Sequence, residues 1–217
     1  MCHSRKSAFL FDNDGVISNS IITLHWWFIQ IVCREITFKQ WSNLSNGNYW
    51  EELNKSPYKE TLLAAEYHPM FPEYIKKHAT TPAFDGALEL LNELKQKAKI
   101  GINTSGFKEN VENFFLHKNF DPNIFDFMGT KETCVSKEEK IFLFSDEANI
   151  PINKMVFIFD TVGDGIEVEH LKKNFGLTTV GVTYGLHTRK HLYKYSQPTH
   201  MVNTVGELRT LLTQFIP

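Results

Sequence analysis

The 217-residue sequence contains no long apolar run, few cysteines and no excess of either charge. No stretch reaches about 18 apolar residues, and the first apolar run stops at Asp12, so we expect neither a membrane span nor a secretory signal. The three cysteines, Cys2, Cys33 and Cys134, are far apart and lack CxxC spacing. This pattern indicates neither a disulfide framework nor a zinc site, and it fits a cytoplasmic protein best.

The near balance of charges limits the class of partner. Lys and Arg number 23 against 25 Asp and Glu, which gives a net charge of −2. Nucleic acids and anionic membranes attract strongly basic proteins, so we expect neither as a partner. Aromatic residues reach 13% of the chain, but they are scattered through apolar runs, which predicts core filling. We therefore expect a small-molecule partner and, by default, a monomer.

Short apolar runs alternate with helix-like segments over most of the chain. Four runs have the length and polar boundaries of buried parallel strands, namely residues 8–11, 99–103, 155–159 and 178–182. Three segments space their apolar residues as a helix does, namely residues 86–99, 137–148 and 162–176. Alternating strands and helices predict an α/β fold with a doubly wound parallel sheet and helices on both faces.

The segment between Val16 and about Pro82 breaks this alternation. It contains no evident buried strand, but aromatic-rich helical pieces at residues 22–36 and 58–71, with SNGN and KSP as breaks between them. We therefore expect a helical insertion after the first strand. The predicted division is a core of residues 1–17 and 83–217 and an inserted helical domain of residues 18–82.

Pairs of carboxylates follow two of the predicted strands. Asp12 and Asp14 are two residues apart on an extended segment, so both project beyond the carboxyl end of the sheet, where open α/β folds bind ligands. Asp160 ends the strand at 155–159, and Asp164 follows on one face of the next helix. Two carboxylates 4 Å apart repel by about 4 kcal/mol at an effective dielectric constant near 20. If buried, they require a shared proton or a cation such as Mg²⁺.

Residues suited to phosphoryl oxygens lie between these pairs. Thr104 directly follows the strand at 99–103, and Lys137 begins the predicted helix at 137–148. A hydroxyl, exposed backbone amides and an ammonium group all bind phosphate oxygens. Lys131 and Lys140 compete with Lys137 for this role, and a solvated position is an alternative for all three.

These motifs, taken in order, resemble those of a known superfamily. The set Asp12-Asn13-Asp14-Gly15-Val16, Thr104, Lys137 and Asp160 with Asp164 resembles the four motifs of the haloacid dehalogenase superfamily, especially phosphatases related to phosphoglycolate phosphatase and β-phosphoglucomutase. Residues 180–212 resemble the closing strands and final helix of that subfamily. The resemblance implies a Rossmann-like core and a helical cap over the pocket, with hinges at Ser18 to Ser20 and Thr81 to Phe84.

The same resemblance implies a Mg²⁺-dependent hydrolysis of a small phosphomonoester. Asp12 would attack phosphorus to form an aspartyl phosphate, while Asp14 would protonate the leaving oxygen and then activate water. Thr104, the Ser105 amide and Lys137 would bind the phosphoryl group. The Mg²⁺ ligands would be the Asp12 carboxylate, the Asp14 backbone carbonyl and Asp160, with Asp164 in support.

Other interpretations stay open. A phosphosugar mutase on the same scaffold would place an Arg shortly after a Gly to hold a second phosphate, whereas this chain has Gly47-Asn48-Tyr49-Trp50. A non-catalytic binding protein would follow if the pocket were occluded by Phe159, where relatives usually have Gly or Glu, or by the aromatic residues of the insertion. The two acidic pairs could instead be turn and helix-cap residues.

Several polar and aromatic side chains are further candidates for substrate contact, although packing or exposure is the simpler interpretation of each. In the insertion they are His25, Trp26, Trp27, Arg34, Lys39, Tyr49, Trp50, Lys55 and His68, and near the end of the core they are His187, Arg189 and His191.

Overall fold

The core is a six-stranded parallel sheet. The computed structural model describes residues 8–59 and 65–216; Cys2 and residues 60–64 of the predicted helical piece lie outside this range. The strands are β1 (Ala8–Phe11), β2 (Lys99–Asn103), β3 (Phe127–Gly129), β4 (Met155–Phe159), β5 (Thr178–Val182) and β6 (His200–Val202). Their order is β3-β2-β1-β4-β5-β6, and every neighbouring pair is parallel. The four predicted strands have the predicted bounds, and the doubly wound fold is confirmed.

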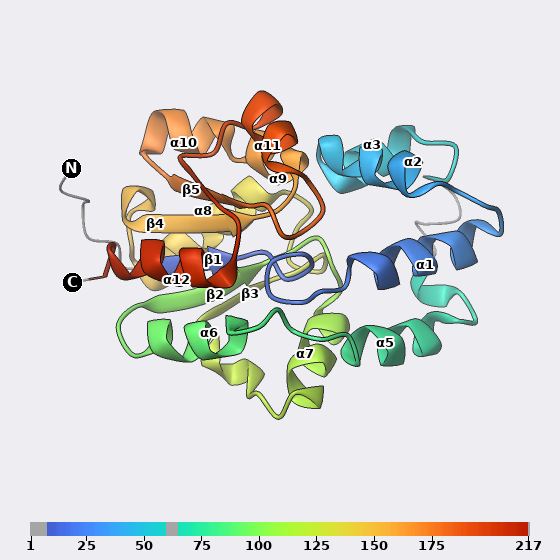
Figure 1. The fold of residues 1–217 in the computed structure, drawn as a ribbon, viewed down its shortest axis with the longest axis horizontal. Helices are drawn as coiled ribbons and strands as arrows, with labels where there is room; N and C mark the ends of the chain where they lie inside the picture. The colour runs from blue at the N-terminus through green and yellow to red at the C-terminus, as the bar shows by residue number, and fades with distance from the viewer. Residues whose placement is uncertain (1–7, 60–64, 217) are drawn as a thin grey trace.

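Helices cover both faces of this sheet (Figure 1). One face carries α6 (Ala87–Lys95), α7 (Lys108–His117) and α12 (Val205–Thr213), and the other carries α8 (Lys137–Ala148), α9 (Val162–Glu167), α10 (Glu169–Phe175) and α11 (Arg189–Tyr195). Two 3₁₀ turns, η3 (Pro122–Ile124) and η4 (Ile152–Lys154), precede β3 and β4. The single helix predicted at 162–176 is two helices, because the backbone of the buried Val168 leaves helical geometry at φ −99° and ψ 7°.

Side-chain alternation along the strands explains why they read as continuous apolar runs. In β1, Phe9 and Phe11 pack with α6, α7 and α12, whereas Ala8 and Leu10 pack with the helices of the opposite face. Each strand residue is therefore buried whichever way it points. The apolar run ends where the chain reaches the carboxyl edge, and the first residue beyond β1 is Asp12.

The inserted helices (the elements between residues 21 and 79) form a separate group beside that edge of the sheet (Figure 1). They are α1 (Ile21–Val32), α2 (Phe38–Ser42), η1 (Asn43–Asn46), α3 (Tyr49–Lys55), η2 (Ala65–Tyr67) and α5 (Phe71–Ala79). They share an aromatic core in which the Trp27 and Tyr74 rings stack at 4.7 Å. Thr37 begins α2 with a capping box, and Asn48, from the predicted SNGN break, caps α3.

The two connections between the core and the inserted helices lie side by side. Ser18 pairs with Ala83 in an antiparallel bridge, and the Asn19 N–H donates to the Pro82 carbonyl at 2.9 Å. The Ser18 and Thr81 hydroxyls are also hydrogen-bonded, at 2.9 Å. The predicted hinge segments are thus paired with each other. No helix in the described part of the chain has both the length and the apolar character that crossing a membrane requires.

Candidate active site

The candidate site lies at the topological switch point of the sheet. The strands run outward from β1 through β2 to β3 on one side, and from β4 through β5 to β6 on the other. Ligands of open α/β sheets bind in the crevice at such a point, beyond the carboxyl ends of the strands. Asp12 follows β1 and Asp160 follows β4, and the Asp12 N–H donates to the Ile158 carbonyl at 2.9 Å. The parallel register therefore brings the two carboxylates to the same place.

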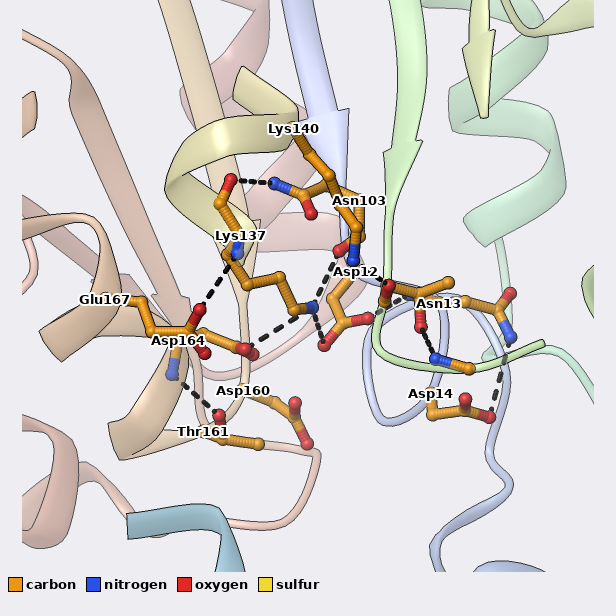
Figure 2. Close-up of polar contacts among 12 residues, drawn as sticks. Asp12, Asn13, Asp14, Asn103, Lys137, Lys140, Asp160, Thr161, Asp164 and Glu167 are labelled. Carbon is orange, nitrogen blue, oxygen red and sulfur yellow. Dashed lines mark hydrogen bonds and ion pairs between the residues drawn. The ribbon is translucent and has the colours of Figure 1, made fainter. Parts of the chain in front are cut away.

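Three carboxylates meet there. Asp12, Asp160 and Asp164 are all buried, and each offers an oxygen within 4.8 Å of the other two. Asp164 reaches the cluster because Thr161 begins α9, accepting a hydrogen bond from the Asp164 N–H at 3.1 Å. Figure 2 shows the two acidic segments facing each other across the end of the sheet.

Lys137 lies between two of these carboxylates (Figure 2). Its buried Nζ is 3.0 Å from Asp12 Oδ2 and 3.3 Å from Asp164 Oδ1, and it donates to the Asn103 carbonyl at 2.7 Å. Burial alone would lower the pKa of Lys137, but Asp12 and Asp164 raise it above its ordinary value. Lys137 therefore keeps its positive charge inside the protein.

The two competing lysines have other partners. Lys140 Nζ is buried and donates to the Thr104 carbonyl at 2.8 Å, and burial lowers its pKa to about 8. Lys131 pairs with Glu66 at 2.8 Å. Of the three lysines considered from the sequence, Lys137 is the one paired with Asp12.

The acidic cluster has the properties of a cation site. One ammonium group faces three buried carboxylates, and burial, together with Asp12, raises the pKa of Asp160 well above its ordinary range. Burial also raises the pKa of Asp164. Asp160 Oδ1 and Asp164 Oδ2 are buried without a hydrogen-bond partner. Buried carboxylate oxygens without donors suit a hard divalent cation, which prefers oxygen ligands.

Glycine at two positions lets the chain pack closely around Asp160. A Cβ atom on Gly15 or on Gly185 would overlap Asp160 Oδ2. Gly15 also has a φ of +78°, which side-chain-bearing residues rarely adopt. The Leu186 N–H, one residue beyond Gly185, donates to the same Oδ2 at 2.7 Å and holds the carboxylate in place.

The loop after β2 supplies neutral polar groups. Thr104 is buried, and its Oγ1 accepts a hydrogen bond from the Gly106 N–H at 3.1 Å. Thr104, Ser105 and Gly106 all line the cavity that also contains Asp12. The Lys140 contact to the Thr104 carbonyl fixes this loop from the protein interior.

Asp14 lies apart from the three clustered carboxylates (Figure 2). It contacts both ends of the insertion. His78 Nε2, in the last turn of α5, is 2.7 Å from Asp14 Oδ1, and the Ser20 hydroxyl donates to the same oxygen. Burial would raise the pKa of Asp14, but the charge and hydrogen bond of His78 outweigh it and lower the pKa. Sequence analysis did not identify His78 or Ser20 as site residues. A fully buried His joined to a residue 64 positions away leaves no local pattern.

A cavity of about 150 Å³ separates the sheet edge from the inserted helices. Of the nine insertion residues considered from the sequence, Trp27, Tyr49 and Trp50 line it, and the other six, all in the described range, do not. Phe159 is absent from the lining of the described cavity, since its ring packs in the core beside Phe157, 5.5 Å between centroids.

The polar cluster after Gly185 also lies outside the lining of that cavity as described. His187, for which exposure was the simpler expectation, is buried, and its Nδ1 accepts a hydrogen bond from the Val162 N–H at 2.8 Å. Arg189 is exposed and contacts Asn203. His187 therefore supports the start of α9, whose second residue is Gly163.

Comparison with known proteins agrees with this geometry. The family model for haloacid dehalogenase-like hydrolases matches residues 9–182, and the comparison with curated proteins found no match. A predicted phosphatase from Clostridium acetobutylicum is 20% identical, with a TM-score of 0.76 over 97% of this chain and 100% of that one. A predicted phosphoglycolate phosphatase from Haemophilus somnus is 14% identical, with a TM-score of 0.73 over 95% and 97%. CbbY from Rhodobacter sphaeroides, solved in complex with phosphate, is 16% identical, with a TM-score of 0.72 over 94% and 96%. Because the family match covers most of the chain, from β1 through β5, this protein belongs to the haloacid dehalogenase-like hydrolase family.

Proposed function

We propose that the protein is a Mg²⁺-dependent phosphatase that hydrolyses a small phosphomonoester through an aspartyl phosphate on Asp12. The observation that carries this proposal is the buried cluster of Asp12, Asp160 and Asp164 around Lys137, beside the Thr104 loop. The structural neighbours support it, since one is described as a predicted phosphoglycolate phosphatase and another binds phosphate.

In the first step, an Asp12 carboxylate oxygen attacks phosphorus and the bond to the ester oxygen breaks. The departing oxygen takes a proton from Asp14, whose pKa is lowered by His78 in the free protein and would be raised by the negative charge of a bound phosphomonoester. This transfer leaves Asp14 as a carboxylate. The Asp12 carboxylate is oriented for attack by Lys137 at Oδ2 and by the Asn13 N–H, which donates to Oδ1 at 2.7 Å. The Thr104 hydroxyl and the Ser105 amide bind the phosphoryl oxygens.

In the second step, water attacks the phosphorus of the aspartyl phosphate while Asp14 accepts a proton from it. The bond between phosphorus and the Asp12 oxygen breaks, which releases inorganic phosphate and restores both residues. When bound, Mg²⁺ supplies positive charge that stabilises the transferring phosphoryl oxygens. Its ligands would be the Asp12 and Asp160 carboxylates and the Asp14 carbonyl, with Asp164 in support.

The two alternatives have less support. A phosphosugar mutase must hold a second phosphate, and the described cavity lining contains no Lys, Arg or His for it. A non-catalytic binding protein would have its pocket closed by Phe159 or by the aromatic side chains of the insertion. The cavity instead extends to Asp12 and Thr104.

A direct assay tests the proposal. We expect the wild type to release p-nitrophenol from p-nitrophenyl phosphate with Mg²⁺ and not after chelation. Asp12→Asn removes the nucleophile and should lower kcat by on the order of 10³-fold or more. Asp146→Asn, an exposed carboxylate on α8, is the matched control and should keep full activity. Metal-independent release, or an Asp12→Asn variant as active as wild type, would falsify the mechanism.

A further inference from the structure

The two ends of the cavity differ in chemical character. The end at the sheet carries Asp12, Asp160 and Thr104, which the proposed reaction uses. The inserted helices line the other end mainly with apolar side chains, among them Leu24, Trp27, Phe28, Ile31, Trp41 and Leu53. If phosphate binds at the sheet end, the leaving group faces the apolar end.

The described lining has no Lys, Arg or His at the apolar end. The nearby Lys131 Nζ lies 4.7 Å from the Trp50 ring centre and is neutralised by Glu66. Residues 60–64, outside the described range, read ETLLA and contain no cationic residue. A carboxylate or second phosphate on the leaving group would therefore lose its hydration without gaining a counter-charge, which is strongly unfavourable.

The volume and the polar groups of the lining restrict the ligand further. An engineered apolar cavity of about 150 Å³ in another protein binds benzene, and the cavity here is about 150 Å³. The indole Nε1 of Trp50, a lining residue, is buried without a hydrogen-bond partner. The Tyr74 hydroxyl accepts a hydrogen bond from Asn110 at 2.6 Å, so its own O–H proton is free to donate. This volume includes the end at which phosphate would bind, so the leaving group can be no larger than about one ring. The lining residues with neutral donors at the apolar end are Trp50, Tyr74, Tyr49 and Ser45.

From these observations we infer that the substrate is a phosphomonoester whose leaving group is uncharged and largely apolar, no larger than about one ring, with neutral acceptors as its only polar atoms. This inference rests on the proposed phosphatase function and names its substrate class. Phosphoglycolate and sugar bisphosphates, whose leaving groups carry a second negative charge, are poor substrates on this view.

A matched substrate series tests the inference. Ethyl phosphate, 2-phenylethyl phosphate and phosphoglycolate all release a primary alkoxide, so they differ mainly in what enters the apolar end. We expect kcat/KM for 2-phenylethyl phosphate to exceed that for ethyl phosphate by about tenfold or more, because apolar groups in a pocket discriminate by 10- to 200-fold. Phosphoglycolate should be the poorest of the three. Equal values, or a preference for phosphoglycolate, would overturn the inference.

Two Arg substitutions on α1 locate the preference in the cavity. Leu24 lines the cavity, whereas Ile22 on the same helix is 70% exposed. Leu24→Arg should abolish the preference for 2-phenylethyl phosphate and improve turnover of phosphoglycolate, and Ile22→Arg should change neither. Should Leu24→Arg fail to fold, Ser45→Lys places a cation at a half-buried lining position. An unchanged preference in a folded lining variant would contradict the inference.

Calorimetry with non-hydrolysable ligands separates this inference from the proposed function. With Mg²⁺ present, 2-phenylethylphosphonate should bind about tenfold more tightly than phosphonoacetate. If it does so while none of the esters is hydrolysed, the ligand class stands and the phosphatase function fails. If the esters are hydrolysed with no apolar preference, the phosphatase function stands and the inferred substrate class is wrong.

Discussion

The sheet edge and the inserted helices face one cavity with opposite chemistry. The sheet edge contributes buried carboxylates and a buried lysine, and it could carry out phosphoryl transfer without regard to the leaving group. The inserted helices contribute aromatic and aliphatic side chains that have no role in bond breaking. On the proposed function, reactivity and substrate choice would reside in different parts of the chain. Variants that damage one part and spare the other test this separation.

After loss of the nucleophile Asp12, the largest effect is expected at Lys137, which belongs to the charged groups at the sheet edge. Lys137→Met removes the ammonium group from Asp12 and Asp164 and should lower kcat by about 10²- to 10³-fold, as loss of one preorganised charge partner does. Preference among leaving groups should stay as in the wild type. The three remaining carboxylates lack a counter-charge, so Mg²⁺ should raise the melting temperature of Lys137→Met more than that of the wild type.

Steady-state kinetics over the ester series and thermal melts with and without Mg²⁺ measure both effects. Lys190→Met, an exposed lysine on α11, is the control and should match the wild type. If Lys137→Met altered the preference among leaving groups, reactivity at the sheet edge and substrate choice by the inserted helices would not be separable.

The contrast between the sheet edge and the inserted helices also explains which features could be predicted from the sequence. Strands buried on both faces form apolar runs with sharp polar ends, so β1 and β4 and the aspartates after them could be placed from sequence. Edge strand β3 has three residues and includes Gly129, too little to form such a run. The break at Val168 was also not predicted, since neither Gly nor Pro lies at Glu167 to Glu169 to mark it.

Less could be predicted for the inserted helices. Aromatic residues occupy several sides of α1, where adjacent Trp26 and Trp27 have different surroundings: Trp27 is buried and lines the cavity, while Trp26 does not line the described cavity. Helical periodicity cannot distinguish a residue that fills a core from one that lines a cavity, because both are apolar. The contact between His78 and Asp14 depends on how α5 meets the β1 loop, which only the tertiary structure fixes.

An intermediate effect on catalysis is expected at His78, which joins the inserted helix α5 to Asp14 in the core. His78→Ala removes the partner that orients Asp14 and lowers its pKa. The carboxyl group should then be protonated more easily but no longer aimed at the departing oxygen, and we expect the loss of orientation to have the larger effect. We expect kcat for ethyl phosphate to fall by on the order of 10- to 100-fold. The loss for p-nitrophenyl phosphate should be smaller, because nitrophenolate departs without a proton. His78→Gln, which keeps a donor, should recover part of the activity.

Kinetics with the two esters distinguishes orientation of Asp14 from a purely structural role. His117→Ala, at the exposed end of α7, controls for loss of a histidine. Equal losses for both esters, with no recovery in His78→Gln, would mean that His78 serves only to hold α5 on the core.

The smallest effect on catalysis is expected at a backbone contact between the core and the inserted helices. A Cβ atom on Gly163 of α9 would overlap the carbonyl oxygen of Gly47, which follows η1 and lines the cavity. Gly163→Ala should therefore push η1 away from α9 and raise KM for 2-phenylethyl phosphate by roughly three- to tenfold, equivalent to about 1 kcal/mol. The free energy of unfolding should fall by roughly 1–3 kcal/mol, because the atoms that a Cβ would overlap are backbone atoms of Ser45 and Gly47 and have to move together. Gly206→Ala in α12 is the control, since the nearest atom to its Cβ would be Thr204 Oγ1 at 3.7 Å. If Gly163→Ala lowered kcat for every ester equally and left KM unchanged, the contact would act on the reacting groups, and substrate choice would not be confined to the inserted helices.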